Sequence, residues 1–182
     1  VEDENLIAEY TVNYKKTHSQ TLLPMLDELV KMTELDLDTI DAIAVAAGPG
    51  SFTGLRIGSA TAKGLGLALK KPLVEIPTVD ALAYNLYDSR ALICPIMDAR
   101  RSQVYTGIYR FQEHKLVTVE AQMAVPMAEM IEKLNARGEE VVFLGDGVPV
   151  FGKMIQENLK VPYSFAPAHV NKQRAAAVAA LG

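Results

Sequence analysis

The feature that most constrains the fold is a glycine-rich run, GPGSFTGLRIG, at residues 48–58. It follows a short apolar run at 42–47 and leads into a segment rich in small residues at 59–66. A buried strand, a glycine loop and a helix in succession are typical of α/β proteins. Such a junction aims backbone N–H groups at an anion, and its glycines also admit a second backbone. The run therefore predicts either a phosphate-binding loop or a docking site for another chain.

Three common loop chemistries do not fit this run. The Walker A pattern requires lysine after its second glycine, but Leu55 follows Gly54. The dinucleotide-binding pattern GxGxxG has Thr53 in place of its third glycine. A hydrolase nucleophile elbow around Ser51 requires glycines where Pro49 and Thr53 stand. These residues weaken the phosphate and nucleophile interpretations.

The predicted helix behind the loop carries small residues four positions apart, at Gly54, Gly58, Ala62 and Gly66. Residues at this spacing share one helix face. Each glycine inside a helix costs about 1 kcal/mol relative to alanine, so their repetition indicates close approach of another backbone. Leu65, on the other side, is apolar too, which is typical of a helix buried on more than one side. Packing against the chain's own sheet stays open, but we favour packing against another subunit.

The remaining pattern predicts an α/β protein in two lobes, residues 1–89 and 90–182. The first lobe is expected to contain strands at 6–12, 40–47 and 72–76 and helices at 19–31, 52–70 and 77–87. For the first of these helices, capping side chains are expected at 17–19. The second lobe is expected to contain an antiparallel meander at 91–97, 103–110 and 115–120, helices at 126–136 and 148–158, and a strand at 140–144. The last helix, with Asn171 as its predicted cap, is a candidate for packing back on the N-terminal lobe.

Composition excludes several classes of protein. The chain has 182 residues, is 49% hydrophobic and carries a net charge of −4, without the basic run expected of a nucleic-acid-binding protein. Cys94 lies alone in an apolar run, which predicts a buried thiol rather than a disulfide scaffold. The three histidines are scattered and form no metal-binding pair. Neither a signal peptide nor an apolar run of about 18 residues is found, so we expect a cytoplasmic protein.

Two further segments are candidates for a binding cleft. Asp98 and Arg100 lie at a predicted turn between strands, and Gly145 and Gly147 follow a later strand. Each segment is either a solvated turn or a wall of a nucleotide cleft. In the second interpretation, the cleft is lined by Gly48, Gly50, Ser51, Asp98, Arg100, Gly145 and Gly147.

The run at 44–69, AVAAGPGSFTGLRIGSATAKGLGLAL, resembles the signature of the TsaB (YeaZ) family of bacterial tRNA threonylcarbamoyladenosine biosynthesis proteins. The flanking stretches THSQTLLPMLDELV, KPLVEIPTVDALAYN and MDARRSQVYTGIYR agree, so the resemblance covers most of the chain. It implies an actin-like, ribonuclease H-like fold with two lobes. The family's first strand, with an Asp-Thr-Ser phosphate-binding turn, should precede Val1, and the sequence stops inside a predicted helix. We therefore expect the fold to be truncated at both ends.

The resemblance also implies a role in a complex. Such proteins are non-catalytic paralogues of the catalytic subunit TsaD, and they act with TsaD and the ATPase TsaE. The complex transfers a threonylcarbamoyl group from threonylcarbamoyl-AMP to N6 of adenosine 37 in tRNAs that read codons starting with A. The metal-binding HxxxH of the catalytic paralogue falls on Thr78 and Leu82 here, and neither can replace histidine. We therefore expect a scaffold or activating subunit without enzymatic activity of its own.

This expectation extends to partners and ligands. In isolation the chain should form a homodimer, and it should meet tRNA only through the complex. It should bind no metal or nucleotide alone, with ATP or ADP confined to the interface with its partner. The predicted subunit interface consists of Leu22, Leu26, Leu29, Gly54, Gly58, Ala62, Leu65 and Gly66. The alternatives are a nucleotide-dependent enzyme or glycoprotease-like peptidase active on its own, or a plain nucleotide-binding module.

Overall fold

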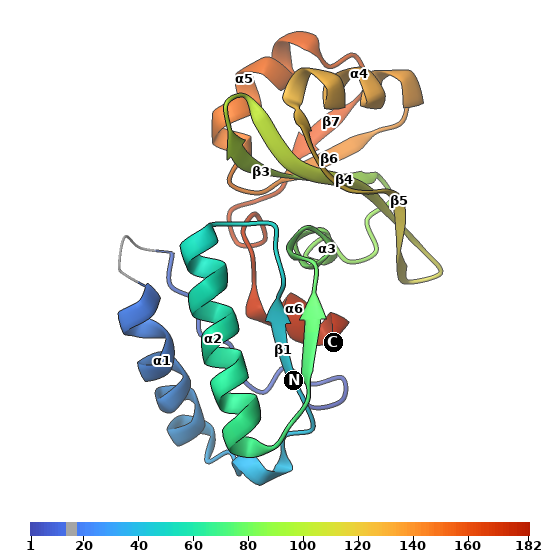
Figure 1. The fold of residues 1–182 in the computed structure, drawn as a ribbon. Coiled ribbons are helices and arrows are strands. Elements are labelled where there is room, and N and C mark those ends of the chain that lie inside the picture. Colours follow the sequence, from blue (N-terminus) through green and yellow to red (C-terminus); the bar gives the residue numbers. More distant parts are fainter. Residues whose placement is uncertain (14–17) are drawn as a thin grey trace. The chain divides into compact units, whose positions relative to one another are not determined.

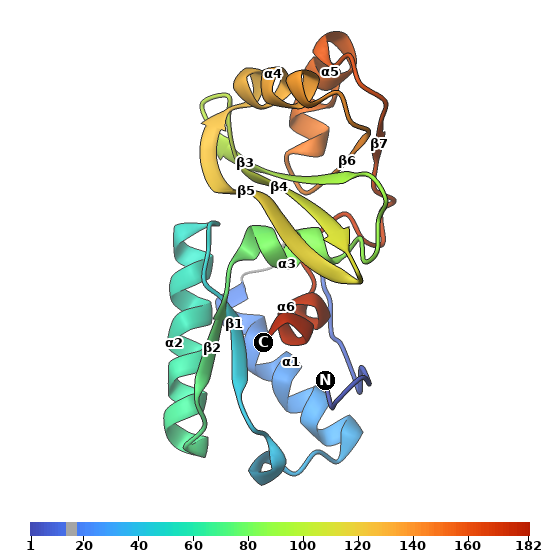
Figure 2. The same cartoon turned by 90° about the vertical axis from the view of Figure 1, so that its right-hand side faces the viewer.

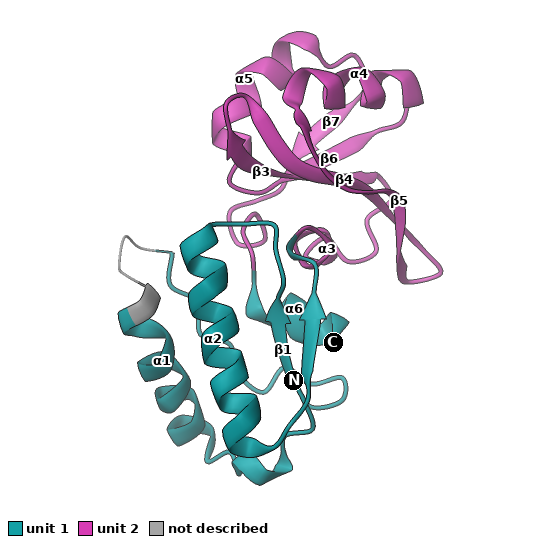
Figure 3. Ribbon diagram, viewed as in Figure 1, with its two compact units in different colours: residues 1–78, 174–182 teal, residues 79–173 magenta. Residues whose placement is uncertain are grey.

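The computed structural model describes residues 1–13 and 18–182 (Figure 1). They form two compact units, residues 1–78 with 174–182 (unit 1) and residues 79–173 (unit 2) (Figure 3). The division falls at residue 78 rather than at the expected residue 89. The reason is that Val79, Leu82 and Ala83 belong to the hydrophobic core of unit 2.

Unit 1 is built around a strand–helix–strand segment. Its elements are α1 (His18–Thr33), the 3-10 turn η1 (Leu37–Thr39), β1 (Ile43–Ala46), α2 (Phe52–Leu69), β2 (Leu73–Ile76) and α6 (Ala175–Leu181). β1 and β2 pair in parallel, with Ile43 opposite Leu73. Figure 2 shows α2 and α6 on opposite sides of this strand pair. The predicted succession of strand, glycine loop, helix and strand is confirmed.

Two local predictions, for residues 6–12 and for Asn171, are wrong. Residues 6–12 form no strand, and the nearest bridge joins Glu2 to Asn5, because alternation alone supplies no neighbouring strand to accept hydrogen bonds. Asn171 does not cap the last helix, since α6 begins after Arg174, and the Asn171 side chain instead accepts a hydrogen bond from the Gly145 N–H at 3.0 Å. The capping prediction for Thr17 lies outside the described residues.

Unit 2 contains a five-stranded sheet with helices on both faces. Its elements are α3 (Thr78–Tyr84, whose first residue belongs to unit 1), β3 (Leu92–Arg100), β4 (Gln103–Gln112), β5 (Lys115–Pro126), α4 (Met127–Arg137), β6 (Val141–Leu144), α5 (Val148–Asn158) and β7 (Tyr163–Phe165). The strand order is β5-β4-β3-β6-β7. The first three strands form the predicted antiparallel meander, and β6 and β7 continue the sheet in parallel.

The main hydrophobic core lies in unit 2. Met130, Leu134 and Ile155, from α4 and α5, pack on one face of the sheet, and Leu82 of α3 packs with Tyr109 on the other. The largest fully buried side chains among the described residues all lie between positions 79 and 173. Unit 1 has a thinner core, and its helices expose more apolar surface.

Candidate functional site: the glycine loop and the exposed face of α2

The glycine loop is fixed at its first residue by α3. The Gly48 N–H donates to the Thr78 hydroxyl at 3.1 Å, and the Thr78 N–H donates to the Gly48 carbonyl at 2.8 Å. Gly48 has a φ of 106°, a conformation that favours glycine. Thr78 is buried, so its hydroxyl and the Gly48 N–H depend on each other for hydrogen bonding.

The loop also caps the helix that follows it. The Ser51 hydroxyl accepts a hydrogen bond from the Gly54 N–H at 3.4 Å, and the Ser51 carbonyl accepts one from Leu55 at 2.9 Å. Serine is a preferred residue at this position because it satisfies an N–H that the helix leaves free. The first turn of α2 is therefore held partly by the chain's own side chain.

The row of small residues on α2 faces the chain itself at its C-terminal end. Ala62 and Gly66 are buried. A Cβ added at Gly66 would lie 3.0 Å from Leu73 Cδ2 and 3.1 Å from the Lys71 carbonyl oxygen. Close packing against the chain's own β2 segment thus accounts for this glycine. Gly58 differs, because a Cβ there would meet nothing within 4 Å.

The other predicted interface residues are only partly accessible. Gly54 and Leu65 on α2 and Leu22, Leu26 and Leu29 on α1 are all half-buried. Elsewhere on α1, Leu23 and Met32 are 56% and 77% exposed. An interface role for the eight predicted residues stays a prediction.

The exposed surface of α2 is a different face, formed by Phe52, Arg56, Ala60, Lys63 and Leu67, which we name the α2 face. Phe52 is 68% exposed and Leu67 is 83% exposed. The Arg56 guanidinium carbon lies 4.3 Å from the centre of the Phe52 ring, which is a cation–π contact. The spacing of the small residues does not predict this face, although arginine and lysine seven residues apart on one helix are a visible signal of it.

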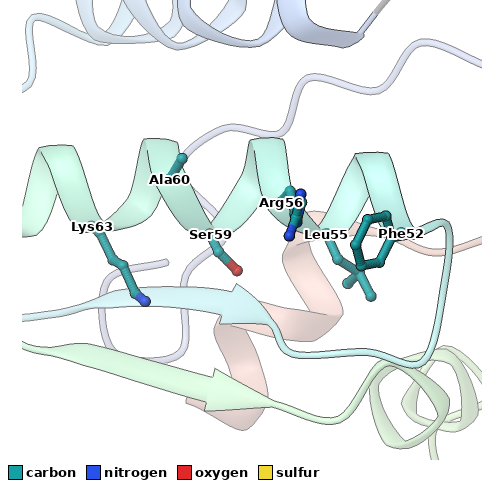
Figure 4. A pocket seen from close by; sticks show the side chains of 6 residues that line it. All are labelled: Phe52, Leu55, Arg56, Ser59, Ala60 and Lys63. Atoms are coloured by element: carbon teal, nitrogen blue, oxygen red, sulfur yellow. The ribbon is translucent and has the colours of Figure 1, made fainter.

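A shallow hollow of about 460 Å³ opens on this face, lined by Phe52, Leu55, Arg56, Ser59, Ala60 and Lys63. Figure 4 shows these side chains along α2. The helix contains no aspartate or glutamate. Neither Arg56 nor Lys63 forms an ion pair with any residue in the described ranges. The hollow is therefore apolar with a positive rim.

The cleft residues predicted in unit 2 lie around the ends of β3 and β6. The Asp98 N–H donates to Asp146 Oδ1 at 3.2 Å, and the Gly147 N–H donates to the Ile96 carbonyl at 3.0 Å. A Cβ at Gly145 would collide with the Ile96 carbonyl. Close packing against Ile96 within unit 2 thus accounts for glycine at both positions.

The remaining members of that set lie apart from these contacts. Arg100 has a φ of 68° and an 87% exposed side chain beside Asp98. Gly48, Gly50 and Ser51 belong to unit 1. A nucleotide cleft formed by the seven residues stays a prediction.

The two positions onto which the resemblance places the metal-binding pair of the catalytic paralogue have other contacts here. Thr78 bonds to Gly48, and Leu82 is fully buried in the core of unit 2. Within the part of the chain that is described, no group of three or more histidine, cysteine or acidic side chains could hold a metal ion. No helix in that part is long and apolar enough to span a bilayer.

Comparisons with known proteins agree with the family resemblance found in the sequence. The family model described as TsaD, tRNA N6-adenosine threonylcarbamoyltransferase, matches residues 5–182. The tRNA threonylcarbamoyladenosine biosynthesis protein TsaB of Bacillus subtilis is 34% identical over 180 residues, which are 99% of this chain and 79% of that protein. TsaB of Escherichia coli is 31% identical over 135 residues, covering 72% of this chain and 58% of that protein.

A solved structure supports the same assignment. YeaZ from Pseudomonas aeruginosa superposes with a TM-score of 0.74 at 26% identity, covering 91% of this chain and 76% of that one. The α/β fold class and the family resemblance inferred from the sequence are thereby confirmed. The chain belongs to the TsaB (YeaZ) family of tRNA threonylcarbamoyladenosine biosynthesis proteins, within the wider family that the TsaD model describes.

Proposed function

We propose that the chain is a non-catalytic scaffold subunit of the assembly that transfers a threonylcarbamoyl group to N6 of adenosine 37 in tRNA. Its principal partner is a TsaD-type catalytic subunit, and a TsaE-like ATPase completes the assembly in the cytoplasm. Membership of the TsaB family supports the pathway. In the absence of the partner, two copies pair through the same surface, because paralogous subunits share it.

The observation that carries this proposal is the distribution of exposed apolar side chains. Among the described residues, all the large exposed apolar side chains except Tyr87 and Val150 lie in unit 1. On its two long helices they include Met32 and Leu67, which are 77% and 83% exposed. Clustered exposed apolar side chains mark protein interaction sites. We therefore place the docking surface on α1 and the α2 face.

Two positions support a role without catalysis. Histidine at 78 and 82 would be needed for the metal site that the resemblance assigns to the catalytic paralogue. Thr78 instead holds the glycine loop, and Leu82 packs in the core. The chemistry is accordingly assigned to the partner.

For nucleotides, we propose that the isolated chain binds neither ATP nor ADP and that either one binds only where the chain meets its partner. The hydrogen bonds of Gly48 with Thr78 and of Gly54 with Ser51 support this, because they occupy polar groups of the loop. Titration calorimetry with ATP, on the chain alone and on the complex, tests it. Binding of ATP by the isolated chain would contradict it.

The docking proposal is tested with Leu67→Asp and the matched control Val150→Asp. Val150 is 57% exposed and belongs to unit 2, whereas α1 and α2 belong to unit 1. Burying a leucine in an interface contributes about 1.5–3 kcal/mol, so Leu67→Asp should weaken binding to the TsaD-type subunit about tenfold or more. Val150→Asp should leave the dissociation constant unchanged.

The same samples test catalysis. The wild-type chain should be inactive alone on tRNA and should stimulate modification when the partner subunits are added. Equal binding by the two variants would refute the docking surface. Modification of tRNA by the chain alone would refute the scaffold role.

A further inference from the structure

We propose that the α2 face recognises a partner helix that carries acidic side chains seven residues apart. This inference rests on the proposed function, and it specifies the chemistry of the surface that the partner must present. One carboxylate binds in the hollow beside Arg56, and the second, seven residues along the partner helix, meets Lys63.

The charges of α2 support an acidic partner. Arg56 and Lys63 lie seven residues apart within α2, which places them on one side of the helix. Both side chains are exposed, and neither forms an ion pair within the described ranges. The chain as a whole carries a net charge of −4, so this positive row opposes its average charge. Complementary charge of this kind selects partners and speeds their association.

The geometry of the hollow suits a carboxylate. The Phe52 ring supports one face of the Arg56 guanidinium, which leaves the N–H donors at its edge free to bind a carboxylate. The Ser59 hydroxyl, also in the lining, supplies a further donor. Apolar atoms of Leu55 and Ala60 complete the lining. Exclusion of water by these apolar atoms strengthens such charge pairs.

The spacing favours a helix over a nucleic-acid strand. Seven residues are two helical turns, about 10.5 Å, and this is the period at which charged positions flank the contact between two packed helices. Leu67 and Ala60 lie beside the cations and are exposed, and they offer apolar contact rather than phosphate contacts. RNA binding relies on many phosphate contacts. A partner helix uses both the cations and the apolar side chains.

The test compares Arg56→Glu/Lys63→Glu with the control Lys160→Glu/Lys172→Glu, which changes the charge equally at exposed positions of unit 2. Binding to the TsaD-type subunit is measured by calorimetry between 50 mM and 500 mM salt. The first double variant should bind about 100-fold more weakly at low salt, and its affinity should lose the salt dependence of the wild type. The control should bind like the wild type. Urea unfolding should show equal stability for both variants, because the altered side chains are exposed.

Other outcomes separate this inference from the proposed function. Equal binding by both double variants, with Leu67→Asp still weakening it, overturns the acidic helix and leaves the docking surface standing. If Arg56→Glu/Lys63→Glu changes only tRNA binding, these two cations bind RNA. If it changes only self-association, they bind a second copy of the chain. Both results overturn the inference. Absence of any binding by the wild type overturns the proposed function together with it.

Discussion

Replacing Gly66 by alanine should destabilise the protein, whereas the same replacement at Gly64 should stabilise it. The two glycines lie two positions apart in α2 and have different surroundings. A Cβ at Gly64 meets nothing within 4 Å. A Cβ at Gly66 meets Leu73 Cδ2 at 3.0 Å and the Lys71 carbonyl oxygen at 3.1 Å.

The expected difference follows from two opposing terms. Alanine is favoured over glycine inside a helix by about 0.8–1 kcal/mol, and Gly64→Ala should gain that amount. Gly66→Ala gains it too, but overpacking costs about 1–3 kcal/mol. The Lys71 segment cannot move away freely, because the Lys71 N–H is bonded to the Gly66 carbonyl at 3.0 Å. The two variants should therefore differ by about 1–3 kcal/mol in the free energy of unfolding.

Urea unfolding followed by circular dichroism measures this difference. In a chain of this size, 1 kcal/mol corresponds to about 2–4 °C in Tm, so thermal scans provide a second measurement. Affinity for the TsaD-type subunit should be unchanged in Gly66→Ala, because Gly66 faces its own chain. If Gly66→Ala were as stable as Gly64→Ala and bound the partner more weakly, the small-residue row would face the partner. The argument from the buried face would then be refuted.

Three further predictions concern single side chains. Thr78→Val should cost about 1–3 kcal/mol in urea unfolding because it leaves the buried Gly48 N–H without its acceptor, whereas Thr78→Ser should cost little. Burial raises the pKa of Glu9, but hydrogen bonds from Arg174 and from the Ala176 N–H outweigh it, and the pKa is lowered overall. The stabilisation from Glu9 is therefore present above the pKa that Glu9 has in the unfolded chain, and it is lost as the pH falls through the pKa in the folded chain. In Glu9→Gln, the free energy of unfolding should depend less on pH below about pH 5 than it does in the wild type. Burial raises the pKa of the Cys94 thiol to about 12, so a thiol reagent at pH 8 should label it only after unfolding.

The elements that the sequence predicts well are those in which local signals agree. The apolar run, the glycine loop and the small-residue helix gave β1 and α2 within a few residues. Gly138 ends α4 in the left-handed conformation expected of a helix-terminating glycine. Residues 6–12 have the alternation of a strand but form none, because a strand requires a partner that alternation does not provide. The three-residue strand β7 is too short to give a periodic signal.

The candidate site was harder to predict, because a spacing of four shows that residues share a face but not where that face points. Ala62 and Gly66 face the chain, whereas Gly64, which is equally small, is exposed. The burial of Gly66 depends on the β2 segment, which lies beyond the helix in sequence and packs against this glycine through Leu73. Charge would have been a better guide than size, since Arg56 and Lys63 identify the exposed side of α2 without reference to other elements.

The glycine loop has the position of a phosphate cradle, but its hydrogen bonds serve the packing of α2. Gly48 uses both its N–H and its carbonyl with Thr78, and Ser51 uses its hydroxyl on the first turn of the helix. A loop fixed at its start by α3 and at its end by a cap holds the axis and rotation of α2. That rotation directs Ala62 and Gly66 toward the chain itself and Arg56 and Lys63 toward solvent. Loss of the Thr78 hydroxyl should therefore weaken partner binding as well as stability, even though Thr78 is buried and cannot touch the partner.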